Sequence, residues 1–257
     1  MRFLSFFRNR FTSYVSKLKR QHTRKNFTPK FAETIFRNDD VGFDTNLEEF
    51  KSFCTIFHNY GLVQLHGINL YGNTSCKYLF YGRTSQYPDF NPVDLHSYEK
   101  CKKKSEPYYI GDNRQLIEYL NQIPDPLALH GLFHSDYANM TYDEQMRDIG
   151  EGLRLMKELF PKKEVDVFIA PFNSYNDDTI EVCKYFGLRL SAKEGEHLEE
   201  LISLNEGPIL DGQLYRYHHH RFYEESTFDY YDLSLEKLDK YLRKNLKRNR
   251  YGIRCCK

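Results

Sequence analysis

The sequence predicts an α/β fold in which parallel strands alternate with helices. Short apolar segments follow one another along residues 31–220, and amphipathic segments with helical spacing lie between them. Signals that begin helices come soon after several of the strand segments. Parallel neighbours need crossover connections, which are usually helices, so this alternation indicates a parallel sheet. The length of 257 residues fits one large domain of this class.

Six apolar segments are the predicted strands, and polar clusters lie at the ends of four of them. The strands are expected at residues 32–36, 62–70, 126–131, 165–170, 188–192 and 213–220. In parallel sheets the carboxyl ends of the strands meet at one edge, where catalytic and binding residues gather. The four clusters are therefore the candidate site.

The helices are predicted from capping signals and apolar spacing. They are expected at residues 45–60, 114–123, 176–187, 194–203 and 234–249, with a further helix after residue 141. Residues 45–48 and 141–144 both match the capping box, in which a Thr and a Glu three residues later satisfy main-chain N–H groups. Gly61 and Gly187 are expected to end their helices. The polar segment 71–112 predicts a long insertion.

The first polar cluster is Arg-Asn-Asp-Asp at residues 37–40. Two adjacent carboxylates, Asp39 and Asp40, repel each other, and their presence is easier to explain if one of them binds a cation. The alternative is an ordinary Asp pair in a turn or at a helix N-terminus. Taken alone, the pair does not decide between the two.

The second cluster is the pair His130 and His134, which follows the strand at 126–131. This spacing brings two imidazoles near one point, an arrangement that zinc favours. Gly131 and the preceding strand argue against a helical metal motif, so a turn is expected. A single histidine here would be read as a core residue. A pair, with an Asp pair at another strand end, favours a metal site.

The third and fourth clusters follow two later strands. Pro171 fixes a turn that can present main-chain N–H groups near Phe172 or Asn173 to a developing oxyanion, or it simply ends the strand.

The fourth cluster consists of three histidines, at residues 218–220. In a strand, His218 and His220 share one face and His219 takes the other. One inward histidine suits a general acid, whereas the alternative is an exposed polar strand.

Basic residues gather at both ends of the chain. Residues 1–30 hold nine Lys and Arg and no acid, and residues 237–257 hold nine and one acid. The whole chain has 37 basic and 36 acidic residues. The segment between the two ends therefore holds 19 basic and 35 acidic residues, which gives it a net charge of −16. Basic ends suit contact with an anionic surface such as phospholipid. The acidic body disfavours a broad nucleic-acid groove, so no nucleic-acid partner is expected.

Residues 3–18 predict a basic amphipathic helix, which either lies on a membrane surface or packs its aromatic face on the body. No apolar run reaches the roughly 18 residues that span a bilayer. Arg8 and Arg10 interrupt the apolar core that a signal peptide needs. Irregular cysteine spacing agrees with a reducing compartment. We therefore expect a cytoplasmic protein, with peripheral contact at the inner membrane face through residues 3–18.

The order of these clusters resembles a known family. An Asp pair, then H-x3-H, then a Pro-aromatic loop and a late histidine are similar to the NodB-type polysaccharide deacetylases, carbohydrate esterase family 4, and above all to divergent relatives encoded with bacterial surface-glycan genes. The resemblance covers about residues 31–225 and is most specific over 130–191. It implies a distorted (β/α)7-8 barrel over 31–232, between a basic amphipathic arm at 1–30 and a basic C-terminal helix and tail at 233–257.

The resemblance also implies roles for the clustered residues. Asp39 matches the catalytic base, and one histidine of residues 218–220 matches the general acid, with His218 and His220 as the candidates. One divalent metal ion, expected to be Zn²⁺, is then held by Asp40, His130 and His134. Main-chain groups of Pro171, Phe172 and Asn173 are expected around the substrate oxyanion.

The implied activity is metal-dependent removal of an N-acetyl group from a sugar of a bacterial surface glycan or its precursor. The sugar substrate is expected to be nucleotide-linked, lipid-linked or an oligosaccharide. One alternative is a catalytically impaired, deacetylase-like glycan-binding protein. Another is a YdjC-like metal hydrolase, whose Asp-Asp-x-Gly start is close to residues 39–42.

Three departures from the family pattern bear on catalysis. Ile169 stands where the family usually has an Arg that positions the base, and Val41 displaces the Gly that usually follows the two Asp. The family's tryptophan motif is absent because the chain has no Trp. We predict that Arg37 or Asn173 replaces the missing Arg.

Overall fold

The structure is a computed structural model that describes residues 34–71, 108–192, 196–204, 209–210, 212–223 and 233–246. Within these residues, seven strands form one sheet in the order β5-β4-β3-β2-β1-β7-β6. All neighbouring strands in this sheet are parallel. The strands are β1 (Ile35–Val41), β2 (Gln64–Ile68), β3 (Leu127–Leu129), β4 (Val167–Ile169), β5 (Arg189–Ser191), β6 (Glu196–His197) and β7 (Leu214–Tyr217).

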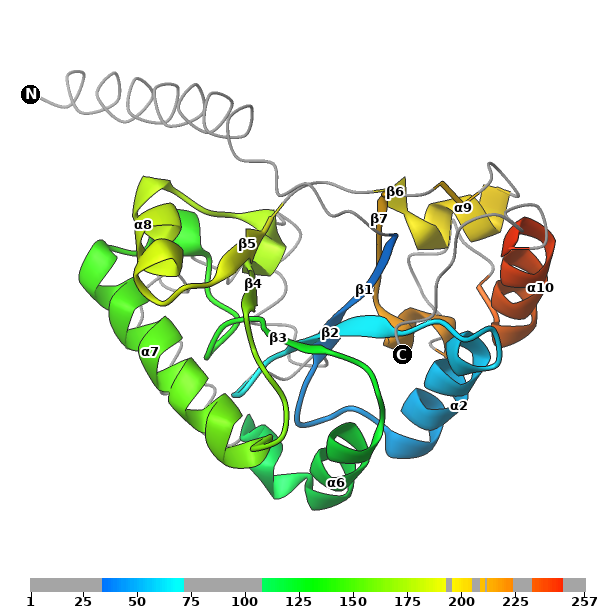
Figure 1. Cartoon of the computed structure of the whole chain (residues 1–257), viewed down its shortest axis with the longest axis horizontal. Helices are drawn as coiled ribbons and strands as arrows, with labels where there is room; N and C mark the ends of the chain where they lie inside the picture. The colour runs from blue at the N-terminus through cyan, green and yellow to red at the C-terminus, as the bar shows by residue number, and fades with distance from the viewer. Residues whose placement is uncertain are drawn as a thin grey trace, which may run out of the picture.

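Helices surround the sheet on its outer side. They are α2 (Leu47–His58), α6 (Arg114–Gln122), α7 (Tyr142–Leu159), α8 (Asp177–Tyr185), α9 (Leu198–Leu204) and α10 (Leu235–Leu246). Figure 1 shows them as an arc that runs from α8 through α7, α6 and α2 to α10 and α9, with the strands inside it. The sheet is thus a curled parallel half-barrel, and the predicted α/β fold of the distorted (β/α) barrel type is confirmed.

The buried apolar side chains form clusters on both faces of the sheet. Phe168 of β4 belongs to a large outer cluster with residues of α6, α7 and α8. Phe36 of β1 belongs to a second outer cluster with α2, α9 and α10. A small inner cluster contains Leu65, Ala128, Val167 and Ile169 from β2, β3 and β4. Neighbours along one strand fall in different clusters because side chains alternate between the two faces.

Two strands end at other places than predicted. β1 continues to Val41, so residues 37–40 belong to the strand instead of following it. β7 ends at Tyr217, and His219–Phe222 form a 3₁₀ turn, so the prediction that residues 218–220 continue the strand is wrong. The pairing of β1 with β7 stops at Asn38 and Tyr217, which leaves the residues beyond Tyr217 without a strand partner on that side.

The helix starts were predicted with mixed success. The capping box of Thr141 and Glu144 is confirmed. The cap of α2 is Asn46 and not Thr45, because the Asn46 side chain accepts the first N–H groups of the helix, while the Thr45 hydroxyl accepts the N–H of Gly42. The predicted helix at 3–18 and most of the predicted insertion at 71–112 lie outside the described residues. The domain limits therefore stay predictions.

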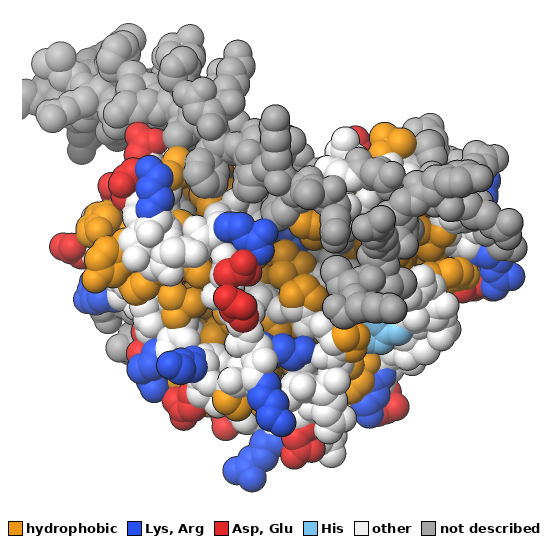
Figure 2. Space-filling model, viewed as in Figure 1, with side chains coloured by type: hydrophobic (Ala, Val, Ile, Leu, Met, Phe, Trp, Pro, Cys, Tyr) orange, Lys and Arg blue, Asp and Glu red, His pale blue; other side chains and the backbone are white. Residues whose placement is uncertain are grey.

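One face of the described residues carries charges of both signs. Figure 2 shows Lys and Arg interspersed with Asp and Glu over the face that carries α6 and α7, without a broad area of one sign. No described helix has both the length and the apolar character needed to cross a bilayer.

Candidate metal centre

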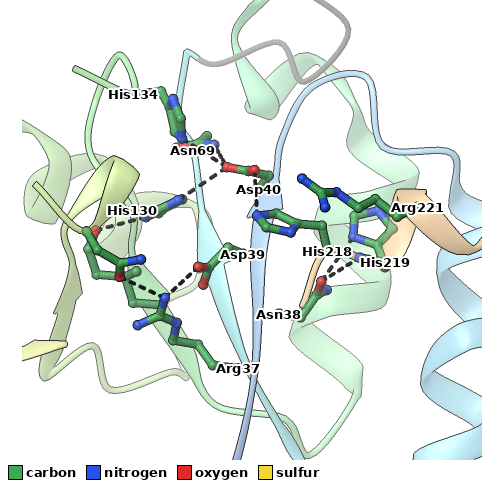
Figure 3. Close-up of polar contacts among 12 residues, drawn as sticks. Arg37, Asn38, Asp39, Asp40, Asn69, His130, His134, His218, His219 and Arg221 are labelled. Carbon is green, nitrogen blue, oxygen red and sulfur yellow. Dashed lines mark hydrogen bonds and ion pairs between the residues drawn. The ribbon is translucent and has the colours of Figure 1, made fainter. Parts of the chain in front are cut away.

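Three predicted metal ligands meet at the carboxyl ends of β1 and β3. The Nε2 atoms of His130 and His134 lie 3.2 and 3.0 Å from Oδ1 of Asp40. All three side chains are buried, and their ligand atoms lie within 4.8 Å of one another. Figure 3 shows both imidazoles directed at the Asp40 carboxylate. The structure thus brings together the three residues that the sequence assigned to one ion.

An irregularity of β1 explains how two adjacent carboxylates reach one site. Neighbouring side chains of a regular strand point to opposite faces. Between its pairs with His66 and Ile68 of β2, β1 contains one more residue than β2, and Asp40 has a φ of 64°. Such a bulge re-aims a side chain. Asp39 keeps the inner face of the strand, and the bulge turns Asp40 toward the two histidines.

Backbone strain gathers at this site. Asp40, His134, Phe172 and Asn173 have φ values of 64°, 53°, 57° and 49°, and in the described part of the chain no other non-glycine residue has a positive φ. Each such residue costs about 1–3 kcal/mol and persists only where the surrounding structure enforces it. The strained residues come from three separate segments, so their meeting is a property of the tertiary structure.

The donor set fits a metal ion. His130 Nδ1 lies 2.8 Å from the main-chain oxygen of Ile169, which can only accept, so Nδ1 carries the hydrogen. A ring with its single hydrogen on Nδ1 directs the lone pair of Nε2 at the Asp40 carboxylate, and a cation between the two atoms removes their repulsion. Two imidazole nitrogens and a carboxylate oxygen are ligands that zinc prefers, and the Ile169 carbonyl orients the His130 ring.

The ionisation of these ligands also suits metal binding. Burial alone would raise the pKa of Asp40, but the nearby His134 charge and hydrogen bonds from His130 and His134 hold that pKa well below its usual value. Burial lowers the pKa of His134 and outweighs the attraction of Asp40. Metal ligands must be an ionised carboxylate and neutral imidazoles. The pKa shifts of Asp40 and His134 are both in the direction that favours these forms.

Arg37 contacts the predicted base. Its fully buried guanidinium donates to Asp39 Oδ2 at 2.7 Å, to Asn173 Oδ1 at 3.1 Å and to Ser191 Oγ at 3.1 Å. Asp39 Oδ1 is buried and accepts no hydrogen bond from the described residues. Ile169, at the position where the family usually has Arg, packs in the inner apolar cluster. From β1, Arg37 therefore contacts Asp39, the carboxylate that the missing Arg would otherwise contact.

Of the three late histidines, His218 faces the Asp pair. Its Nε2 lies 3.4 Å from Asp40 Oδ2, and its Nδ1 lies 3.4 Å from Glu199 Oε1. Burial alone would lower the pKa of His218, but Glu199 and Asp40 outweigh it and raise that pKa. His219 points to the other side of β1, against Asn38, as Figure 3 shows. His220 packs beside the His218 ring, and burial lowers its pKa to about 4.

The turn at Pro171–Asn173 only partly matches its predicted role. The Asn173 N–H donates to the main-chain oxygen of Ala170 at 2.9 Å, and its side chain accepts from Arg37. The expectation that Asn173 offers its N–H to an oxyanion is therefore wrong, because that group is already used. The Phe172 ring packs edge-on against His134, with centroids 4.6 Å apart, so this residue does lie at the site.

Three further residues contact the site, and sequence patterns did not assign them these roles. Glu199, fully buried, accepts from the main-chain N–H of His218 and pairs with Arg221. Asn69 donates to Asp40 Oδ1 at 3.2 Å. Asp148 of α7 accepts the N–H of Leu132, inside the loop that carries both histidine ligands. Glu199 stands directly beside Glu200 in a short helix, so its spacing in the sequence gives no signal.

Comparisons with known proteins agree with the resemblance to polysaccharide deacetylases. A family model described as polysaccharide deacetylase matches residues 105–191, the segment that contains β3, both histidine ligands and the Pro171 turn. No curated protein sequence matches the chain.

Several solved structures share the fold. A family 4 carbohydrate esterase pseudoenzyme from Bacillus anthracis is 13% identical with a TM-score of 0.52, and the match covers 88% of this chain and 64% of that one. A peptidoglycan N-acetylglucosamine deacetylase is 9% identical with a TM-score of 0.57, covering 86% and 85%. A family 4 carbohydrate esterase from Streptomyces lividans, in complex with acetate, is 10% identical with a TM-score of 0.50, covering 84% and 90%. The chain thus spans less than two thirds of the first of these proteins.

Proposed function

We propose that this chain is a member of the NodB-type polysaccharide deacetylases and that it is a metal-dependent sugar N-deacetylase. The substrate is an N-acetylated sugar of a bacterial surface glycan or its precursor. The observation that carries the proposal is the convergence of Asp40, His130 and His134, with Asp39 on one side and His218 on the other (Figure 3).

Asp40, His130 and His134 would hold the divalent ion, expected to be Zn²⁺. A divalent ion bound there supplies a water of lowered pKa and polarises the acetamide carbonyl. Asp39 takes the proton of the attacking water on Oδ1, the oxygen that Arg37 leaves uncovered. The guanidinium keeps Asp39 in one orientation, so that the base is already in place when substrate binds.

His218 donates a proton to the departing sugar amine. Its Nδ1 and main-chain N–H both face Glu199, which fixes the ring and raises the pKa of His218. A histidine that is protonated near neutral pH is a competent general acid. We assign this role to His218 and not to His220, because burial lowers the pKa of His220 to about 4 and keeps it neutral.

A second candidate is a glycan-binding protein without turnover. Ile169 in place of the usual Arg favours it, and one of the solved structures with this fold is described as a pseudoenzyme. The buried contact of Arg37 with Asp39 supports the enzyme instead, because it provides the base with a guanidinium partner from another strand.

The experiment is metal analysis of the purified protein together with acetate release from a panel of acetamido sugars. The panel includes nucleotide-linked sugars and oligosaccharides. We expect bound divalent metal and acetate release from one of these substrates. His130→Ala should lose both, whereas Asp39→Asn should keep the metal and lose turnover by about 10²–10⁴-fold. Equal metal in His130→Ala and the parent protein contradicts the metal site. Bound metal without acetate release favours the binding protein.

A lipid-linked substrate at the inner membrane face would suit residues 3–18, which lie outside the described residues. Replacing Phe3, Phe7 and Phe11 with Ser should release the protein from anionic vesicles, because these rings supply the apolar face of the predicted helix. Co-sedimentation with vesicles measures this. If the intact protein does not sediment with vesicles, the membrane proposal is wrong, and the deacetylase proposal is unaffected. We propose no nucleic-acid partner, because the segment between the two basic ends carries a net charge of −16.

A further inference from the structure

A row of buried hydrogen bonds crosses the sheet on the side that faces α2, away from the metal ligands. Asp125, before β3, accepts from His66 Nε2 at 3.1 Å, and His66 Nδ1 lies 3.2 Å from Asn38 Nδ2. Asn38 Oδ1 accepts the main-chain N–H of His219 at 2.9 Å. All four residues are buried, and the Phe50 ring of α2 packs on both histidines.

The direction of every hydrogen bond in this row is fixed from its ends. A main-chain N–H can only donate, so the Asn38 amide must turn its oxygen to His219 and its nitrogen to His66. His66 Nδ1 then accepts, and its hydrogen lies on Nε2, from which it donates to Asp125. At the far end, Asp125 accepts the main-chain N–H of Gln64 at 2.9 Å. Neither end can be reversed.

This direction rules against a second metal site. Ligand atoms of Cys54, His66 and Asp125 lie within 4.8 Å of one another, which by itself would suit an ion. Nε2 of His66 carries a hydrogen, however, and burial raises the pKa of the Cys54 thiol above its usual value. Nε2 therefore offers no lone pair to an ion, and the Cys54 thiol would first have to lose its proton. The cluster is a hydrogen-bonded support.

We propose that Asn38 is a positioning residue for His218 and that His66 and Asp125 fix its orientation. The turn that carries His218 has two successive main-chain N–H groups, and buried side chains accept both. The His218 N–H donates to Glu199 Oε1 at 2.7 Å, and the His219 N–H donates to Asn38 Oδ1. The turn is thus held from two sides.

The end of the β1–β7 ladder explains why a side chain is needed there. The last pair in register is Asn38 with Tyr217, so no further ladder bond holds His218 and His219. The Asn38 side-chain amide instead holds His219, two residues beyond the last ladder pair. Asn38 also directly precedes Asp39 and Asp40, so the same residue ties the histidine to the Asp pair. The 3.4 Å separation of His218 Nε2 and Asp40 Oδ2 depends on this link. The inference rests on the proposed function, in which His218 is the acid.

The first test compares Asn38→Leu with the matched control Asn121→Leu. Asn121, remote from the site, also bonds main-chain groups through its amide. On whichever acetamido sugar the parent protein deacetylates, Asn38→Leu should lower kcat by about tenfold or more, since small displacements of catalytic groups have large effects. KM and metal content should stay within about twofold. The Asn121→Leu values should match the parent. An unchanged kcat in Asn38→Leu overturns the proposal.

A second pair of variants keeps the test decisive if Asn38→Leu does not fold. Gln at position 66 offers an acceptor and a donor about as far apart as the two ring nitrogens, whereas Leu offers neither. We expect kcat of His66→Gln to stay within about threefold of the parent and to exceed that of His66→Leu by about tenfold. Equal kcat values in these two variants contradict the proposal.

Nitrogen-15 NMR of the histidine rings tests the row without any activity. The parent protein should show His66 with its hydrogen on Nε2, and Asn38→Asp should move a hydrogen onto Nδ1, because a carboxylate oxygen then faces that atom. A hydrogen on Nδ1 in the parent, or a metal equivalent lost on Cys54→Ser, overturns the inference. If the parent shows the expected tautomer but no deacetylation, the proposed function has failed while the hydrogen-bonded row stands.

Discussion

Arg37 is the single residue on which the activity of the proposed site should depend most. A buried carboxylate needs a partner, and Asp39 has one only because Arg37 lies two residues earlier on the same face of β1. The same guanidinium binds Asn173 and Ser191, which joins β1 to the ends of β4 and β5. One side chain thus orients the base and links three strands.

We predict that Arg37→Ala lowers kcat by about 10²-fold while metal content stays unchanged, because Asp39 loses its orientation but the three ligands remain. Arg37→Lys should recover only part of the rate, since an ammonium cannot reproduce a guanidinium that bonds three residues. Asn173→Ala should have a smaller effect, because it removes only one partner of Arg37. Steady-state kinetics with metal analysis measure these effects. Unchanged turnover in Arg37→Ala would mean that the missing Arg is not replaced by this residue.

The loop between His130 and His134 is the element that should set the affinity of the proposed metal site. Gly131 has a φ of 85°, and a Cβ there would lie 3.2 Å from Pro171. Asp148 of α7 holds the loop from behind, where it accepts from the Leu132 N–H and from the Tyr137 hydroxyl. A glycine, a helix carboxylate and the Pro171 turn therefore set the separation of the two imidazoles.

We predict that Gly131→Ala weakens metal binding and lowers the free energy of unfolding by about 1–2 kcal/mol. Gly187→Ala is the matched control. Gly187 also has a positive φ, 70°, but nothing lies within 4 Å of its Cβ position. The control should show a similar loss of stability with normal metal affinity. Metal titration and denaturant unfolding separate the two effects, and equal metal affinities would contradict the role given to the loop.

Asp148 predicts a pH effect on stability. Burial raises its pKa from 3.8 to about 6 despite hydrogen bonds from Tyr137 and Leu132. A group whose folded pKa is raised stabilises the fold below its unfolded pKa, and this contribution is lost as pH rises through the folded value. Relative to Asp148→Asn, the parent should therefore lose about 2 kcal/mol between pH 4 and pH 6. Denaturant unfolding at both pH values measures it. A constant difference between the two proteins contradicts the prediction.

At the scale of the whole molecule, the metal site joins parts that are distant in the sequence. Asp40 lies on β1, and both histidines follow β3, so a bound ion connects two segments of the parallel sheet. The ligands also hold strained backbone at Asp40 and His134. An ion that binds only the assembled site must stabilise the fold.

We predict that a chelator lowers the melting temperature of the parent protein and that added Zn²⁺ restores it. An ion present at about 100 times its Kd stabilises the folded state by about 2.7 kcal/mol. Differential scanning calorimetry measures the shift. His130→Ala is the control, and its melting temperature should not respond to either treatment. The same response in the variant and the parent would place the stabilising ion elsewhere.

The sequence by itself determined the alternation of strands and helices and the identities of Asp40, His130 and His134. It could do so because local spacing decides which residues lie at strand ends, and parallel strands bring those ends together. It placed the end of β7 wrongly, because that end depends on where the partner strand β1 stops pairing.

Only the tertiary structure decided how the side chains are aimed. The bulge in β1 lets both Asp39 and Asp40 face the site, and the 3₁₀ turn selects His218 from three adjacent histidines. Glu199 and Asn38 receive their roles from contacts with residues 19 and 181 positions away. The direction of a side chain beyond a strand end depends on such long-range hydrogen bonds. The spacing of residues along the sequence does not predict which distant residues will form them.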